Sequence, residues 1–534
     1  MTRRDFLFSV AAARPALERS QPRVPAGLDL SRQWKAGVCR FRLKNRSAAP
    51  IAPREIVLFD WRHGFPATTR MYGEGFQMLS QTGGTIGAPA AIGAYEDAVH
   101  YRIPKPPGAA TVYNLLLLSP DATHHVLLAF ASSRRFVGRF HVRPDSIQVC
   151  CDLEDLALEP GETWDLEDFV VLQGPRPAAL LKQLAGLLRA NHPIDLPATP
   201  PRGWCSWVAF ADLVSSEGVL ANARAAREHA PWLRYIQIDG GYMDRLGDWL
   251  EPSATFRGSV RDTLLRVRDL GLEPALWLAP FIAERQSRIF ERHPSWFVRD
   301  AAGAPLPADR VTYGGWKRPP WFALDGTHPE VQDYLAGLLH QLRSEWGATY
   351  FKLDANFWGA MHGGRFHDPK ATRVEAYRRG MEAIRRGSGG AFLLGCNHPM
   401  WPSLGLIHGS RSSNDIEPKW DRVRSTSREN LSRLWQNGRL WWNDPDTVQF
   451  AGSLTPDELE FHLAVIQAAG GLVMCSDNLP ALTAAQFARL EKLSAPAAGA
   501  EFDAAMQQGR ARQNGHEVRY SLDWEKHSAR IGGL

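Results

Sequence analysis

The sequence predicts an α/β protein, in which a (β/α)8 barrel follows an N-terminal β-sandwich and precedes a short C-terminal β segment. Three observations favour this fold class. The chain has 534 residues, too many for one core, so two or three domains are expected. Short alternating apolar runs fill residues 25–176. From residue 203 onward, short apolar strands alternate with helical stretches, the arrangement that produces a parallel sheet.

The N-terminal region, residues 25–176, reads as a β-sandwich. A Ser-Pro-Asp turn between two apolar runs is typical of a hairpin, and several short strands at such spacing favour two packed sheets. The predicted strands are 38–43, 55–60, 110–118, 126–131, 136–142 and 146–153.

Residues 177–202 are predicted to link the two domains. A helix is expected over 178–190, because five leucines recur there on one face. The segment from His192 to Pro201 holds four prolines, which cannot continue a helix, so the domain boundary is placed here.

Residues 203–495 are predicted to form the barrel. Eight strand candidates over roughly 290 residues fit the count and length of this fold. The strands are 203–207, 235–239, 273–279, 349–354, 391–396, 409–413, 440–442 and 471–476. The helices include 217–229, 259–270, 329–346, 373–386, 427–437 and 456–468.

The two termini carry weaker signals. Residues 1–24 form a leader in which Arg3 and Arg4 precede an apolar stretch, as in a twin-arginine export signal. A periplasmic or exported location follows if this leader is a signal; otherwise a cytoplasmic one follows. Residues 496–534 contain one strand-like run, 517–524. No stretch of about 18 apolar residues occurs, so no membrane span is expected.

Composition narrows the classes of partner. The 62 basic residues are mixed with 57 acidic ones, which argues against a nucleic-acid partner. The six cysteines contain no CxxC pair, and His362 and His367 lack the spacing of a helical zinc motif. No metal and no cofactor is therefore expected, and homo-oligomerisation is left open.

Acidic and polar residues gather at the predicted strand ends, where barrel enzymes place their catalytic groups. These residues are Ser206, Asp239, Asp354, Cys396, Asn397, Asp415, Asp444 and Asp477. Several acids without metal-binding histidines suit glycoside hydrolysis, which needs one carboxylate to attack and one to protonate the departing oxygen.

Two of these acids have informative neighbours. Asp354 follows Lys352 by two residues, and a nearby cation would keep a nucleophilic carboxylate ionised. Asp415 lies in a polar loop directly after a strand and is expected to titrate high enough to donate a proton.

Several motifs cover the predicted barrel in a recognisable order. They are Gly203-Trp-Cys-Ser-Trp207, Tyr235-Ile-Gln-Ile-Asp239-Gly-Gly-Tyr242, Gly247-Asp-Trp-Leu-Glu251, Ala275-Leu-Trp-Leu-Ala-Pro-Phe281, His293-Pro-Ser-Trp296, Ala323-Leu-Asp-Gly-Thr-His-Pro-Glu-Val331, Tyr350-Phe-Lys-Leu-Asp354, Leu393-Leu-Gly-Cys396 and Asn443-Asp-Pro-Asp446, with Gly75-Phe-Gln-Met-Leu-Ser80 in the sandwich. With these motifs the chain resembles glycoside hydrolase family 36, the bacterial α-galactosidase group related to family 27.

The resemblance implies a retaining hydrolase of terminal α-linked sugars in oligosaccharides or other glycosides. It implies that Asp354 is the nucleophile and Asp415 the acid/base. Sugar contacts are implied for Asp239, Trp277, Lys352, Cys396 and Arg411. Asn397 and His398 replace the small residue that the family places after Cys396, beside the expected position of the 2-substituent. Trp204 and Trp207 are expected to pack beneath the pocket, and Asp444, Asp446 and Asp477 are left between site and structural roles.

One departure from the family affects the choice of sugar. Galactosidases of this group usually carry two adjacent aspartates after the second strand, which hold the hydroxyls at positions 4 and 6, whereas this chain has Asp239-Gly240. Three alternatives therefore remain open. They are another α-glycosidase specificity such as α-N-acetylgalactosaminidase or α-glucosidase, a transglycosylase of the raffinose-synthase type, and a non-catalytic sugar-binding protein.

Overall fold

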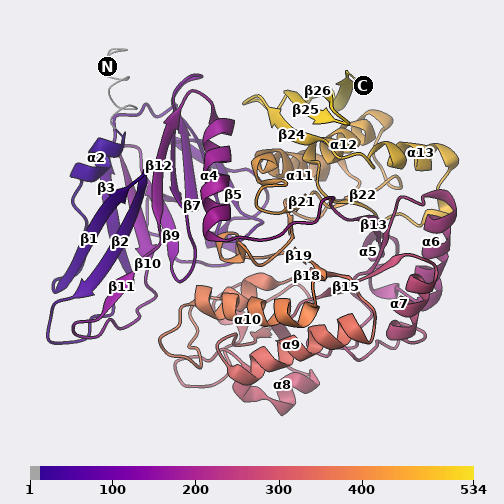
Figure 1. Cartoon of the computed structure of the whole chain (residues 1–534), viewed down its shortest axis with the longest axis horizontal. Helices are drawn as coiled ribbons and strands as arrows, with labels where there is room; N and C mark the ends of the chain where they lie inside the picture. Colours follow the sequence, from indigo (N-terminus) through magenta and orange to yellow (C-terminus); the bar gives the residue numbers. More distant parts are fainter. Residues whose placement is uncertain (1–12, 534) are drawn as a thin grey trace.

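The structure, a computed structural model of the chain, describes residues 13–533. A sheet-rich N-terminal domain lies beside a larger domain of parallel strands and helices (Figure 1). The paired arginines Arg3 and Arg4 of the predicted leader lie outside the described residues, and the first described helix is α2 (Ala13–Arg19). Among the described helices, none is both long and apolar enough to cross a membrane.

The N-terminal domain is a β-sandwich, as predicted. Its strands pair antiparallel throughout, and the long strand β7 joins two layers by pairing with β8 along one half and with β9 along the other. One layer has the order β1-β2-β12-β8-β7-β4-β5-β6, and β3, β10 and β9 form the other. The aromatic rings of Phe41, Phe59 and Phe169 meet between the layers.

The sandwich strands within the described residues are β1 (Leu28–Lys35), β2 (Val38–Asn45), β3 (Glu55–Arg62), β4 (Arg70–Glu74), β5 (Gln81–Thr85), β6 (Ala88–Ala91), β7 (Ala110–Ser119), β8 (His125–Phe130), β9 (Val137–Val142), β10 (Ser146–Asp152), β11 (Thr163–Asp165) and β12 (Phe169–Gly174), with the short helix α3 (Asp97–His100). The six predicted strands all form. The helix α4 (Pro177–Asn191) follows the sandwich and leads into the Pro-rich segment.

The larger domain is the predicted (β/α)8 barrel, and its strands lie parallel to one another. A strand forms at each of the eight predicted positions, although the seventh lies two residues later than predicted. The strands are β13 (Arg202–Cys205), β14 (Tyr235–Ile238), β15 (Glu273–Leu278), β18 (Tyr350–Leu353), β19 (Phe392–Gly395), β20 (Gly409–Arg411), β21 (Trp442–Asp444) and β23 (Val473–Cys475). A further short strand, β22 (Thr447–Val448), pairs with β23.

The barrel closes at an interrupted strand. β21 pairs with β20 and β22 pairs with β23, and only Pro445 and Asp446 separate β21 from β22. Proline cannot donate a ladder hydrogen bond, and Asp446 has a left-handed φ of 71°. The seventh strand position is therefore split in two, which moves Asp446 out of the ladder.

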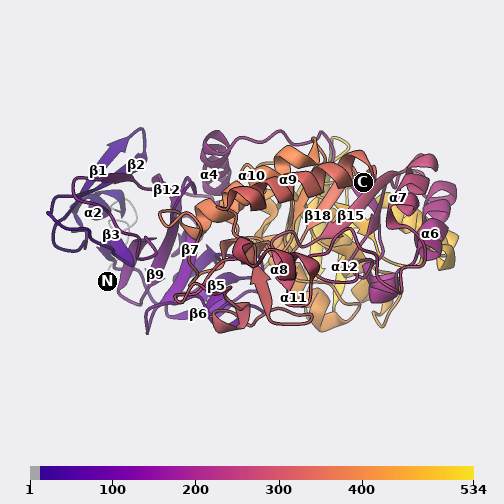
Figure 2. The ribbon, with the colours of Figure 1, turned by 90° about the horizontal axis from the view of Figure 1, so that it is seen from below.

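Helices alternate with the barrel strands (Figure 2). The longer ones are α6 (Ser216–His229), α7 (Val260–Asp269), α9 (Pro329–Ser344), α10 (Arg373–Ser388), α11 (Trp420–Ser432), α12 (Pro456–Ala469) and α13 (Ala484–Lys492). The shorter elements include α5 (Trp207–Phe210), α8 (Arg288–Arg292), η5 (Trp401–Ser403) and η6 (Leu434–Gln436), with the strand pair β16 (Ile282–Glu284) and β17 (Trp321–Ala323). The prediction of a helix over 427–437 was misplaced, because α11 begins at Trp420 in a charged stretch and residues 434–436 form η6.

The C-terminal residues form more structure than the single predicted strand. Within the described part of this segment, β24 (Ala498–Phe502), β25 (Gln508–Gln513), β26 (His516–Asp523) and β27 (Ser528–Gly532) make an antiparallel sheet. Only β26 coincides with the predicted run. Its inward residues Val518, Tyr520 and Leu522 pack with Phe461 of α12, so the sheet covers one side of the barrel.

Candidate active site

The predicted site residues lie at the carboxyl ends of parallel strands, which meet at one mouth of the barrel. Asp239 follows β14, Asp354 follows β18, and Arg411 ends β20. Cys396 and Asn397 follow β19, and Trp277 lies near the end of β15. The fold therefore brings together residues that are up to about 170 positions apart in the chain.

The Asp354 carboxylate is buried and held by three hydrogen bonds. Trp277 Nε1 donates to its Oδ2 over 3.1 Å, Asn397 Nδ2 donates to its Oδ1 over 2.9 Å, and the backbone N–H of Ala355 donates to Oδ1 over 2.7 Å. Hydrogen bonds to an ionised carboxylate are among the stronger ones in proteins. These donors fix the plane of the carboxylate and leave Oδ2 with the fewer partners.

Lys352 does not contact Asp354, which corrects the sequence interpretation. Its Nζ lies 2.9 Å from Asp239 Oδ2, and Gln237 Nε2 donates to the same oxygen over 2.6 Å. Burial acts to lower the pKa of Lys352, but Asp239 outweighs burial and the pKa lies well above its usual value. Two buried side chains of opposite charge thus form one wall of the site.

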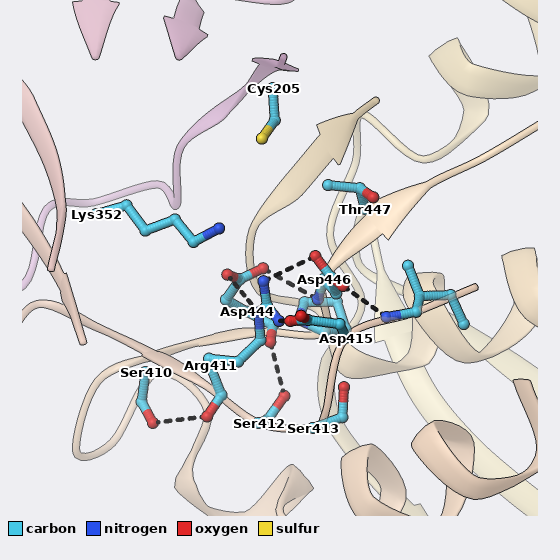
Figure 3. A network of polar contacts seen from close by, with 12 residues as sticks. Cys205, Lys352, Ser410, Arg411, Ser412, Ser413, Asp415, Asp444, Asp446 and Thr447 are labelled. Atoms are coloured by element: carbon cyan, nitrogen blue, oxygen red, sulfur yellow. Dashed lines mark hydrogen bonds and ion pairs between the residues drawn. The ribbon is translucent and has the colours of Figure 1, made fainter. Parts of the chain in front are cut away.

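Arg411 binds Asp415, and this contact changes the expected titration of the candidate acid/base. Arg411 Nη1 lies 2.6 Å from Asp415 Oδ1 (Figure 3). Partial loss of water acts to raise the pKa of Asp415, but the attraction of Arg411 and then of Lys352 outweighs it, so the pKa lies below its ordinary value. The structure therefore contradicts the prediction of a high-titrating Asp415. The Asp415 side chain remains 66% exposed and open to a ligand.

The aromatic residues near the mouth divide into buried and exposed ones. Trp204 is fully buried, as predicted, and its Nε1 donates to the backbone oxygen of Asp477. Trp207 is 39% exposed, so the prediction that it packs beneath the pocket is wrong. A Cβ atom at Gly240 would lie 3.5 Å from the Trp207 ring and 3.9 Å from the Trp277 ring. The wall beside Gly240 is therefore formed by two indoles.

The sandwich contributes residues to the site that the sequence did not indicate. Tyr101 is fully buried, and its hydroxyl donates to Asn397 Oδ1 over 3.3 Å. The backbone N–H of Met78 donates to the oxygen of His398, so the segment that carries Asn397 is held by the neighbouring domain. No local pattern marks Tyr101, because it reaches the site only through the packing of two domains.

The remaining predicted contact, Cys396, is buried beside Asp354. Burial first and then the charge of Asp354 raise the pKa of its thiol well above the usual value. Cys396 is therefore a neutral, weakly polar group in this wall of the site.

Among the residues that the structure describes, the one group of His, Cys and acidic side chains close enough to share a metal ion lies in the sandwich. It consists of Glu55, His141 and Cys150, on β3, β9 and β10. Glu55 already pairs there with Arg139. The barrel mouth instead holds carboxylates balanced by Lys352 and Arg411.

Comparisons with known proteins show what the chain is similar to in sequence and fold. The family model for melibiase matches residues 239–382. A myogenesis-regulating glycosidase of Mus musculus is 31% identical over 169 residues, which cover 31% of this chain and 23% of that protein. The aligned region thus spans about a quarter of this curated relative.

Solved structures match over nearly the whole chain. The α-galactosidase TtGalA of Thermus thermophilus, in complex with p-nitrophenyl α-D-galactopyranoside, has a TM-score of 0.68 and 26% identity and covers 92% of this chain and 98% of its own. The family 36 α-galactosidase AgaA of Geobacillus stearothermophilus has a TM-score of 0.64 and 14% identity, with coverages of 93% and 73%, and shares the fold. The chain is therefore similar in sequence and fold to the α-galactosidases of glycoside hydrolase family 36.

Proposed function

We propose that the protein hydrolyses terminal α-linked sugars of oligosaccharides or other glycosides with retention of configuration, Asp354 acting as nucleophile and Asp415 as acid/base. The observation that carries the proposal is the pairing of two differently held carboxylates at one barrel mouth. Asp354 is buried and fixed by three donors, whereas Asp415 is exposed beside Arg411. Such a difference between two acids suits one attacking group and one proton donor.

The proposed reaction has two steps. In the first, an Asp354 oxygen forms a bond to the anomeric carbon while the glycosidic bond breaks and Asp415 gives its proton to the departing oxygen. In the second, water attacks the anomeric carbon, Asp415 takes a proton from that water, and the bond to Asp354 breaks. Asp354 Oδ2 is the better candidate for the attacking oxygen, because Oδ1 accepts two of the three hydrogen bonds.

Binding must change the surroundings of Asp415 for this mechanism to operate. In the structure Arg411 lowers the pKa of Asp415, which disfavours the protonated form that the first step requires. We propose that a sugar draws Arg411 away from Asp415 by offering it a hydroxyl, after which Asp415 regains its proton affinity.

A panel of p-nitrophenyl α-glycosides tests the proposal. The galactoside, the N-acetylgalactosaminide and the glucoside would be assayed with the wild type and with Asp354→Asn. We expect release of p-nitrophenol from one of these sugars by the wild type and its loss in the variant. If Asp354→Asn kept its activity, Asp354 would not be the nucleophile. If the wild type bound a glycoside without cleaving any of them, the result would favour a sugar-binding protein.

The glycine at position 240 favours a second candidate function, in which the enzyme has a different sugar specificity. The wall beside it offers two indoles where the family usually supplies a carboxylate. A hydroxyl facing this wall would lose a charged hydrogen bond worth about 1.5–3 kcal/mol. We propose that the protein discriminates less between a galactoside and its 6-deoxy analogue than its relatives with two aspartates do.

Gly240→Asp should restore the preference for the complete galactoside. The site has room for the added Cβ atom, since both indoles lie at ordinary contact distance from it. We expect the ratio of kcat/KM for galactoside over 6-deoxygalactoside to rise by about 10-fold or more, from the value of one charged hydrogen bond.

Gly240→Ala is the matched control, because it adds the Cβ atom without the carboxylate and should leave that ratio unchanged. An equal ratio in Gly240→Asp and Gly240→Ala would show that position 240 does not read the 6-hydroxyl.

A further inference from the structure

One arginine at the barrel mouth is shared by three carboxylates. Arg411 Nη1 lies 2.6 Å from Asp415, Arg411 Nη2 lies 2.9 Å from Asp446, and Arg411 Nε lies 3.3 Å from Asp444 (Figure 3). Arg411, Asp444 and Asp446 are buried, whereas Asp415 is exposed. Any change in the ion pairs of Asp444 and Asp446 with Arg411 must therefore change the strength of the ion pair between Arg411 and Asp415.

Asp446 also holds the backbone beside Asp415. The N–H of Ile416, the next residue after Asp415, donates to Asp446 Oδ2 over 2.7 Å. The Asp446 N–H in turn donates to Asp444 Oδ1 over 3.1 Å. Asp446 can make both contacts because it lies in the interruption between β21 and β22, where its backbone leaves the sheet ladder.

Three carboxylates compete for the guanidinium of Arg411. The further cations that act on Asp415 are Lys352 of β18 and Arg422 of α11. Asp415 also acts on Tyr95 of the sandwich, a neutral phenol whose pKa is raised mainly by burial. The pKa of Asp446 is raised to about 6, mainly by burial. The attraction of Arg411 lowers this pKa, whereas repulsion by Asp415 and Asp444 raises it. A negative Asp446 thus competes with Asp415 for Arg411 and repels the charge on Asp415.

We infer that Asp446 is a positioning residue for Asp415, which it controls by drawing Arg411 away from the Asp415 carboxylate and by anchoring the Ile416 backbone. Both the competition and the repulsion favour a proton on Asp415. The inference rests on the proposed role of Asp415 as acid/base. It assigns to the Asn443-Asp-Pro-Asp446 turn a function in proton donation in place of a purely structural one.

Asp446→Asn separates the two effects, because asparagine keeps an oxygen that accepts the Ile416 N–H but removes the charge. We expect the alkaline limb of kcat/KM to move to lower pH by about one pH unit, as Arg411 then binds Asp415 without competition. Two α-glycosides of one sugar would be compared, one with a p-nitrophenyl and one with a methyl leaving group. Cleavage of the methyl glycoside should fall at least 10-fold more than that of the p-nitrophenyl glycoside, because only the poorer leaving group needs full protonation.

Asp477→Asn serves as the control, since Asp477 is another buried strand-end aspartate that bonds the N–H groups of Phe450 and Ala451 rather than Arg411. Thermal unfolding would confirm that each variant is folded, and Asp446→Ser would replace Asp446→Asn if Asp446→Asn does not fold.

Asp415→Ala distinguishes a failure of the inference about Asp446 from a failure of the proposed role of Asp415. Suppose that Asp415→Ala selectively loses activity on the methyl glycoside, while Asp446→Asn keeps the wild-type alkaline limb and the wild-type ratio of activities on the two glycosides. The inference about Asp446 is then wrong, and the proposed role of Asp415 stands. If Asp415→Ala shows no such selectivity, the proposed role of Asp415 fails first.

Discussion

Asp354→Asn should lower kcat/KM by about 10⁴-fold or more on every glycoside that the wild type cleaves, because an amide cannot form the covalent intermediate. The substitution is nearly isosteric, and an amide oxygen can still accept the hydrogen bonds of Asn397 and Ala355. Binding of a sugar should therefore persist while turnover is lost. The measurement is steady-state kinetics together with calorimetric binding of the product sugar.

A smaller side chain at the same position provides a matched test of the role. In Asp354→Gly, azide should take the place of the missing carboxylate and give a glycosyl azide of β configuration, since it attacks the face that Asp354 occupied. If Asp354→Gly gave the α-glycosyl azide, or if azide rescued Asp415→Gly to the β-glycosyl azide, the proposed roles of Asp354 and Asp415 would be contradicted.

Breaking the ion pair between Glu74 and Arg433 should destabilise the protein by about 3–5 kcal/mol, the usual effect of leaving one partner of a buried pair uncompensated. Arg433 Nη2 lies 2.7 Å from Glu74 Oε2, and both side chains are fully buried. Glu74 belongs to the sandwich and Arg433 follows α11 of the barrel. Glu74→Gln should therefore lower the unfolding temperature, which differential scanning calorimetry measures.

The same variant should also reduce activity. Arg433 Nη1 donates to the backbone oxygen of Ser412 over 3.1 Å, next to Arg411 of the site. The exposed pair Arg14–Glu18 is the control, and Glu18→Gln should change stability by less than about 1 kcal/mol. Equal effects of Glu74→Gln and Glu18→Gln would show that the two domains do not depend on the buried pair.

Much of the barrel could be predicted from the sequence because its strands are buried on both faces and read as short apolar runs. The prediction erred where polarity and function interrupt that pattern. Strand β21 was placed over 440–442 because Leu440 and Trp441 are apolar, whereas the ladder runs through Asn443 and Asp444. Strands such as β5 (Gln81–Thr85) and β25 (Gln508–Gln513) carry few apolar residues and gave no signal.

The position of the candidate site at the strand ends could be predicted, but the pairings of its side chains could not. Asp239 and Asp354 were identifiable because they end strands that must meet at one mouth, whereas Arg411 was implied only by the resemblance to the family. Which carboxylate Lys352 binds depends on side-chain directions across neighbouring strands, which a spacing of two residues does not determine. The contact of Tyr101 with Asn397 joins positions 296 residues apart and depends on how two domains pack.

The anomeric configuration of the first product tests the central claim most directly. Proton NMR spectroscopy of the reaction within its first minutes, on whichever α-glycoside the wild type cleaves, distinguishes the two stereochemical outcomes before mutarotation. Two successive displacements through Asp354 predict that the α anomer appears first and the β anomer only later. If the β anomer appears first, water attacks the substrate directly and Asp354 is not a covalent nucleophile.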